Sequence, residues 1–187
     1  MKELKDSRFA AIVCILVGLT VAAWQIVVPA SRLVRGQPLN WLVPIKHTTD
    51  RLAWPAAYVD VAQLPGSLPV WVLARGVLLT ALAVGALYCL TRVLIDVASG
   101  RPFGKRNALW LRISAALTFA TCLVPLFADG FLHAAVLRGL DPSSEILWAK
   151  QFGSLEAFLL GIALLLAGMA DAFARGREIQ EDTEGLI

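Results

Sequence analysis

Seven acidic or basic side chains lie within the long apolar runs of this sequence. They are Arg75, Arg92, Arg112, Asp129, His133, Glu156 and Asp171. Hydrocarbon surroundings make an isolated charge costly, so such groups either pair with one another or line a polar path. Two kinds of chemistry are therefore possible: ion pairs that join helices, or a relay that carries protons or ions.

The segments that must position these residues are typical of a membrane protein. Apolar residues make up 58% of the 187 positions, charged residues make up 17%, and the mean hydropathy is +0.69. Soluble domains have roughly 45–50% apolar and about 25% charged residues. Four apolar stretches, at about 9–30, 68–95, 108–137 and 152–174, are long enough to cross a bilayer. The sequence therefore predicts an all-α membrane fold, a four-transmembrane-helix bundle forming one domain over residues 1–187.

The distribution of lysine and arginine predicts the orientation. The N-terminus, the segment between the second and third spans, and the tail at 175–187 are rich in basic residues, whereas the loop at 31–66 and the segment between the third and fourth spans have fewer for their length. Cytoplasmic segments carry the excess of lysine and arginine. Both termini are therefore predicted to be cytoplasmic, with the loop at 31–66 outside.

The outer loop contains two stretches with strand-like composition. These are "LNWLVPI" and "AAYVDVAQL", separated by proline and polar residues. They predict a small β-hairpin. Trp41, Trp54 and Tyr58 are expected at headgroup level, where aromatic residues gather.

Counting residues from the span ends predicts which charges meet. Arg75 and Asp129 both lie roughly 10–12 Å deep from the outer side at 1.5 Å per residue. His133 and Glu156 form a shallower candidate pair on the same side, and near the inner side Asp171 matches the depth of both Arg92 and Arg112. Structural pairing is favoured, because each acid has a basic neighbour at its depth. Pro125 should kink the third span and free a carbonyl, which keeps a relay open as the alternative.

Two inner segments are candidates for contact with lipid or a partner. The first is a basic turn comprising Arg101, Phe103, Lys105, Arg106 and Asn107. A basic cluster beside the headgroups is typical of anionic-lipid contact. The second is an acidic tail comprising Glu178, Glu181, Asp182 and Glu184, held away from the bilayer by Arg175 and Arg177. Contact with a basic partner and simple solvation are both open for this tail.

The sequence gives no indication of an enzyme or a bound cofactor. Cys14, Cys89 and Cys122 are scattered without metal or disulfide spacing, and each lies in an apolar run. The two histidines, His47 and His133, cannot supply paired haem ligands across a bundle, because His47 lies in the outer loop. No nucleophile lies beside a base, and the basic residues cluster at membrane ends instead of forming a nucleic-acid surface.

The block "GRPFGKRNALWLR" and the tail "FARGREIQEDTEGLI" together resemble a family of bacterial integral membrane proteins, domain of unknown function 2975. The family's positions at the start of the third helix are matched by Phe103, Asn107 and Arg112. Those of its tail are matched by Phe173, Gly176, Ile179, Asp182, Glu184, Gly185 and Ile187, with isoleucine at 179 in place of the usual leucine.

The resemblance implies a multi-pass protein of the bacterial cytoplasmic (inner) membrane. Similar proteins are often encoded beside a small helix-turn-helix regulator, which implies a non-enzymatic membrane partner or sensor that controls such a DNA-binding protein. The alternative function is a small transporter or channel subunit, a homo-oligomer, with a polar path through the second to fourth spans.

Overall fold

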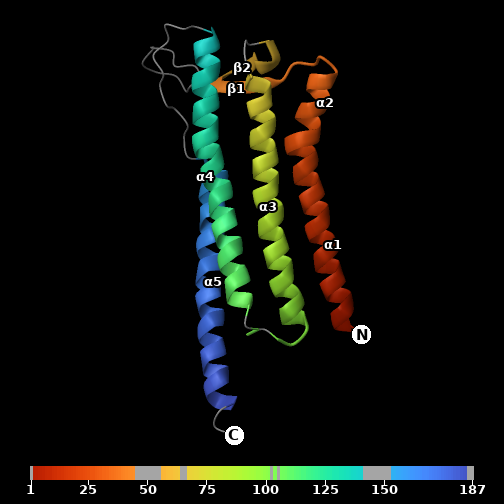
Figure 1. Ribbon diagram of the computed structural model, residues 1–187, viewed down its shortest axis with the longest axis vertical. Coiled ribbons are helices and arrows are strands. Elements are labelled where there is room, and N and C mark those ends of the chain that lie inside the picture. Colours follow the sequence, from red (N-terminus) through yellow and green to blue (C-terminus); the bar gives the residue numbers. More distant parts are fainter. Residues whose placement is uncertain are drawn as a thin grey trace. The chain divides into compact units, whose positions relative to one another are not determined.

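The computed structural model (Figure 1) describes residues 2–44, 56–63, 67–101, 103–104, 106–140 and 153–184. Four of its helices are long and apolar enough to cross a membrane, by length and composition. They are Ile12–Val34, Leu68–Ala98, Asn107–Val136 and Ser154–Thr183. The predicted set of four apolar helices is confirmed at this level, and it fits a multi-pass membrane protein.

The first apolar helix consists of three consecutive helical pieces. α1 covers Lys2–Ala22, the π-helical turn η1 covers Ala23–Val27, and α2 covers Val28–Val34. Pro29 lies in the first turn of α2, where a missing N–H is tolerated. The helix therefore continues beyond residue 30, where the sequence analysis ended the span, and stops before Gly36, which has a φ of 63°.

The next two helices are joined by a short turn with a defined helix stop. α3 covers Leu68–Ala98 and α4 covers Asn107–Leu140. Gly100 has a φ of 73°, and its N–H donates to the carbonyl of Val97 at 3.0 Å. The N–H of Arg101 donates to the carbonyl of Asp96 at 3.0 Å. This pair of bonds is a Schellman motif, which ends a helix at a left-handed glycine.

The last helix extends beyond the apolar run that predicted it. α5 covers Ser154–Glu184, whereas the predicted span ended at 174. Residues 175–184 are mostly polar, yet glutamate, glutamine and arginine are good helix formers, so the helix continues after the apolar composition ends.

A two-stranded antiparallel sheet lies in the loop at 31–66. β1 covers Asn40–Pro44 and β2 covers Ala56–Asp60, followed by the 3₁₀ turn η2 at Val61–Gln63. The two strands lie within the two stretches that were predicted to be strand-like. Asp60 closes the end of the sheet, because its Oδ1 accepts the N–H of Leu39 at 2.8 Å. A position on the membrane surface stays a prediction, and the side chains of Trp41, Trp54 and Tyr58 lie outside the described residues.

The chain divides into two compact units. Unit 1 comprises Met1–Val21, Leu79–Leu123 and Phe152–Ile187, and unit 2 comprises Ala22–Leu78 and Val124–Gln151. The buried core of unit 1 is Val93, Leu111, Ala115, Leu166 and Ala170. That of unit 2 is Leu39, Val61, Leu68, Val72, Leu132 and Val136. The prediction of one domain stays a prediction.

Three segments lie at one end of unit 1. They are the start of α1, the turn between α3 and α4, and the end of α5 (Figure 1). These are the segments that the lysine and arginine count assigned to one side of the membrane. Which side they face stays a prediction.

Candidate functional site

Arg75 of α3 and Asp129 of α4 form a buried ion pair in unit 2. The Nε of Arg75 donates to Oδ1 of Asp129, and its Nη2 donates to Oδ2 at 3.1 Å. Their side chains are only 17% and 12% exposed. The structure thus brings together the two residues that depth counting paired. Because Arg75 binds both carboxylate oxygens, the geometry is that of a two-point structural pair.

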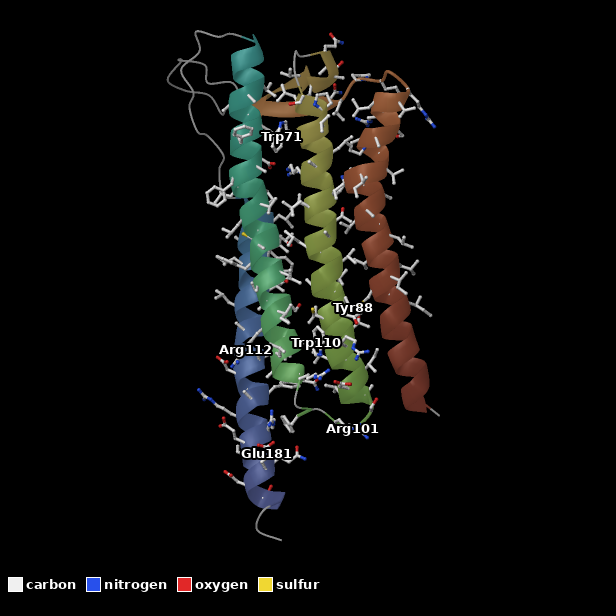
Figure 2. All side chains as sticks on the ribbon, in the orientation of Figure 1. Trp71, Tyr88, Arg101, Trp110, Arg112 and Glu181 are labelled. Atoms are coloured by element: carbon white, nitrogen blue, oxygen red, sulfur yellow. The ribbon has the colours of Figure 1, made fainter. Side chains whose placement is uncertain are left out.

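The backbone packs tightly beside this pair. A Cβ on Gly76 would overlap the carbonyl of Gln25 in η1, so only glycine allows α3 to approach this closely. One turn away, the rings of Trp71 and Phe131 meet edge to face with centroids 6.0 Å apart. Trp71 is labelled in Figure 2. Close packing of this kind holds the charged pair in one geometry.

A second ion pair joins α4 and α5 in unit 1. The Nη2 of Arg112 lies 3.0 Å from Oδ1 of Asp171, and the two side chains are 60% and 65% exposed. By depth along the spans, Arg92 and Arg112 were equal candidates for Asp171. Arg92 is exposed on α3, and between described residues no ion pair includes it.

His133 and Glu156 lie in different units. His133 is half-buried in α4 within unit 2, and Glu156 is half-buried in the first turn of α5 within unit 1. Their pairing stays a prediction. An acidic side chain at this position suits the positive end of the α5 dipole. The same turn receives a contact from α4, because the Cys122 thiol lies 3.4 Å from the Glu156 carbonyl.

Asn107 organises the basic turn between α3 and α4. It is fully buried at the first residue of α4, and its Nδ2 donates to the carbonyl of Arg101 at 3.2 Å. The N–H of Gly104 donates to the same carbonyl at 3.2 Å. The turn is thereby closed on itself and presents Phe103 on its surface. Arg101 and Arg106 are exposed, and Lys105 lies outside the described residues.

Phe103 connects this turn to α5. Its ring centroid lies 5.8 Å from that of Phe173, and its ring also rests on the backbone at Gly176. The contact joins the α3–α4 turn to the end of α5, the two segments on which the family resemblance rests. From the sequence, both segments were expected on one side of the membrane, but their contact was not predicted. Their aromatic and glycine residues were the available sign of such a contact.

A groove of about 360 Å³ lies beside this contact. It is formed by the turn, the first residues of α4 and the last turns of α5, and its lining includes Leu109, Arg112, Phe173, Arg177, Glu178 and Glu181. Figure 2 shows Arg112 and Glu181 on neighbouring helices at this end, with Arg101 in the turn. Within the lining, the Nε of Arg177 lies 2.9 Å from Oε1 of Glu181.

Arg177 and Glu181 bind each other on one face of α5, a pair that was not predicted. The expected positions of Arg177 at the headgroups and of Glu181 on a partner stay predictions. Their four-residue spacing could have indicated this pair. Glu178 and Asp182 are exposed, and of Glu184 only the helical backbone is described.

Among the described residues, no group of three or more His, Cys, Asp or Glu side chains could hold a metal ion. No protein-family model, curated protein sequence or solved structure matches this chain significantly.

Proposed function

We propose that this protein is a non-enzymatic membrane protein whose inner end holds a small cytoplasmic DNA-binding regulator of the helix-turn-helix class. In this proposal it lies in the bacterial inner membrane with both termini in the cytoplasm. The regulator class rests on the family resemblance, and the docking surface rests on the shape and charge of α5.

The observation that carries the proposal is the continuation of α5 to Glu184. A disordered tail would offer its acidic groups in many positions and lose entropy on binding. A helix presents them in a fixed pattern. Glu178 and Asp182 are one turn apart and both exposed, and Ile179 between them is 65% exposed.

An exposed apolar residue flanked by acids suits a basic protein partner. DNA-binding proteins carry lysine and arginine for phosphate contacts. The acids of α5 would attract that surface, and Ile179 would supply apolar contact area at the centre of the interface. The Phe103 contact at Gly176 supports α5 just before this acidic stretch.

The experiment first reads the open reading frames beside this gene for a small helix-turn-helix protein. That protein is then offered to the full-length membrane protein in detergent, and its capture is measured. Replacing Glu178, Glu181, Asp182 and Glu184 with the corresponding amides should weaken capture at low salt. Binding of the unmodified chain should fall as ionic strength rises, because salt screens exposed charges.

The matched control replaces Arg101 and Arg106, at the same end of the protein, with glutamine. Capture should then be unchanged or stronger. If this control loses capture and the amide variant keeps it, the basic turn is the docking surface and the acidic-helix proposal is wrong. If neither the unmodified chain nor either variant captures the regulator, the partner class is wrong.

The alternative, an oligomeric transporter or channel subunit, has less support. It requires ionisable groups that exchange partners along a path. Arg75 engages both oxygens of Asp129 in a buried two-point pair, a geometry that favours a structural role for the deepest charges.

A further inference from the structure

The groove at the inner end of unit 1 lies where apolar helix gives way to polar helix. α4 enters its apolar run after Asn107, and the apolar run of α5 ends near Ala174 in the sequence, although the helix itself continues to Glu184. The lining accordingly combines apolar side chains, such as Leu109 and Phe173, with charged ones. A protein surface at this level faces phospholipid headgroups, the ligands present there at the highest concentration.

The charges of the lining balance. Arg112 and Arg177 contribute two positive charges, and Glu178 and Glu181 contribute two negative charges. A guanidinium has five N–H donors. The described ion pairs of Arg112 and Arg177 each use one nitrogen, so further donors remain for a second oxyanion. The groove can therefore accept an anionic group and a cationic group together.

We propose that this groove binds the headgroup of phosphatidylethanolamine, a zwitterionic phospholipid with a primary ammonium. The phosphate contacts Arg112 and Arg177, and the ammonium donates hydrogen bonds to Glu178 and Glu181. The acyl chains continue along the apolar surface of α4 and α5. The volume of about 360 Å³ lies at the small end of ligand pockets, which fits a compact headgroup.

Charge and hydrogen bonding select this headgroup over the other common ones. A purely anionic headgroup would bring a net negative charge next to two carboxylates. A trimethylammonium headgroup has no N–H donor for those carboxylates and is normally held in a cage of aromatic rings. In this lining Phe173 is the only aromatic residue. Glu178 and Glu181 also belong to the acidic stretch proposed above to meet the regulator, but lipid binding in the groove does not require that partner.

The test uses the purified full-length protein in detergent and native mass spectrometry. The protein is mixed with equal amounts of phosphatidylethanolamine, phosphatidylcholine and phosphatidylglycerol that differ in acyl mass only enough to be resolved. Phosphatidylethanolamine should form the most abundant adduct. Arg112→Gln and Arg177→Gln should each lower it by about two- to fivefold, the size expected for loss of one exposed ionic contact.

Two further variants make the test specific. Arg175→Gln is the matched control, because Arg175 is exposed on the same helix and does not line the groove. It should leave phosphatidylethanolamine binding unchanged. Glu178→Gln leaves the described ion pairs intact and should shift the preference toward phosphatidylglycerol.

Several outcomes would overturn the proposal. One is a preference of the unmodified protein for phosphatidylglycerol, which would make the groove a general anionic-lipid surface. A second is equal binding of all three lipids. A third is a loss of phosphatidylethanolamine adduct in Arg175→Gln as large as that in Arg177→Gln. If Arg112→Gln or Arg177→Gln lowers the unfolding temperature, the Glu178→Gln result decides, and an unchanged lipid preference in that variant refutes the site.

Discussion

Gly176 of α5 lies directly under the ring of Phe103, so that a methyl group on Gly176 would overlap ring carbons. The two residues are 73 positions apart, and their contact fixes the α3–α4 turn against the end of α5. Only glycine gives the ring this access. The contact between the α3–α4 turn and the end of α5 therefore depends on the missing side chain of Gly176.

Replacing Gly176 with alanine should loosen this contact. Overpacking costs typically about 1–3 kcal/mol, partly offset by the better helix propensity of alanine. We expect a lower unfolding temperature in detergent and faster proteolysis at the α3–α4 turn. Gly168→Ala is the matched control, since nothing lies within 4 Å of a Cβ there on the same helix.

The ring itself supplies a second control for this prediction. In a Phe103→Ala background, Gly176→Ala should cost nothing, because the overlapping ring is gone. An equal loss with and without the ring would show that Gly176 matters for another reason.

The buried pair in unit 2 should show strong coupling between its two side chains. Arg75→Gln or Asp129→Asn leaves the other charge buried, which should cost about 3–5 kcal/mol of folding free energy. The double variant should cost clearly less than the sum of the two single losses. Denaturant titration of the four proteins of this cycle gives the coupling energy, and strict additivity would contradict the pair.

The exposed pair provides the comparison for that cycle. Arg112 and Asp171 are more than half exposed, so their coupling should be about 0–1 kcal/mol. A coupling as large as that of the buried pair would mean that Arg112 and Asp171 are less hydrated than their exposure indicates.

A buried hydroxyl should contribute to the packing of α4 on α3. The Oγ of Ser114 donates to the carbonyl of Ala86 at 3.1 Å and is fully buried. Ser114→Ala should destabilise the protein by about 0.6 kcal/mol, the average for hydrogen bonds between membrane helices. Thr118→Val removes a bond within α4 only and should cost less. The reverse order of the two losses in equilibrium unfolding would contradict this role.

Reporter fusions test the orientation. A reporter active only in the cytoplasm should work after Ile187 and fail near Thr48, and one active only outside should do the opposite. We expect this result because lysine and arginine are in excess at the start of α1, in the α3–α4 turn and at the end of α5. Cytoplasmic segments carry such an excess. Cytoplasmic activity near Thr48 would show that the orientation is inverted.

The apolar runs predicted the helices that could cross a membrane, but they predicted the ends less well. Hydropathy reports where a helix leaves hydrocarbon, whereas helix propensity and stop residues decide where it ends. α2 continues past Pro29 to Val34, and α5 continues through ten polar-rich positions to Glu184. Gly36 and Gly100 have positive φ values, and each lies just after the end of a helix. A glycine in the left-handed conformation commonly ends a helix, whatever the hydropathy of its neighbours.

Depth along a helix could be predicted, but rotation about the helix axis could not. Counting residues from the span ends paired Arg75 with Asp129, because only one partner existed at that depth. For Asp171 two arginines were equally deep, and the structure joins it to Arg112. The Phe103–Phe173 contact depends on rotation in the same way, so composition could place the two rings at one end but could not predict that they meet.

Because α5 is one uninterrupted helix from Ser154 to Glu184, its membrane part and its charged end cannot turn independently. Each added residue rotates the rest of the helix by about 100°, at 3.6 residues per turn. One alanine inserted after Gly176 would leave Phe103 on its glycine and keep Arg177 bonded to Glu181, yet aim both charges away from the turn. Inserting seven residues, close to two full turns, would point the charged residues in their original direction again but farther along the helix axis. The angular phase of α5, and not only the identity of its charged residues, therefore sets which molecules its end can meet.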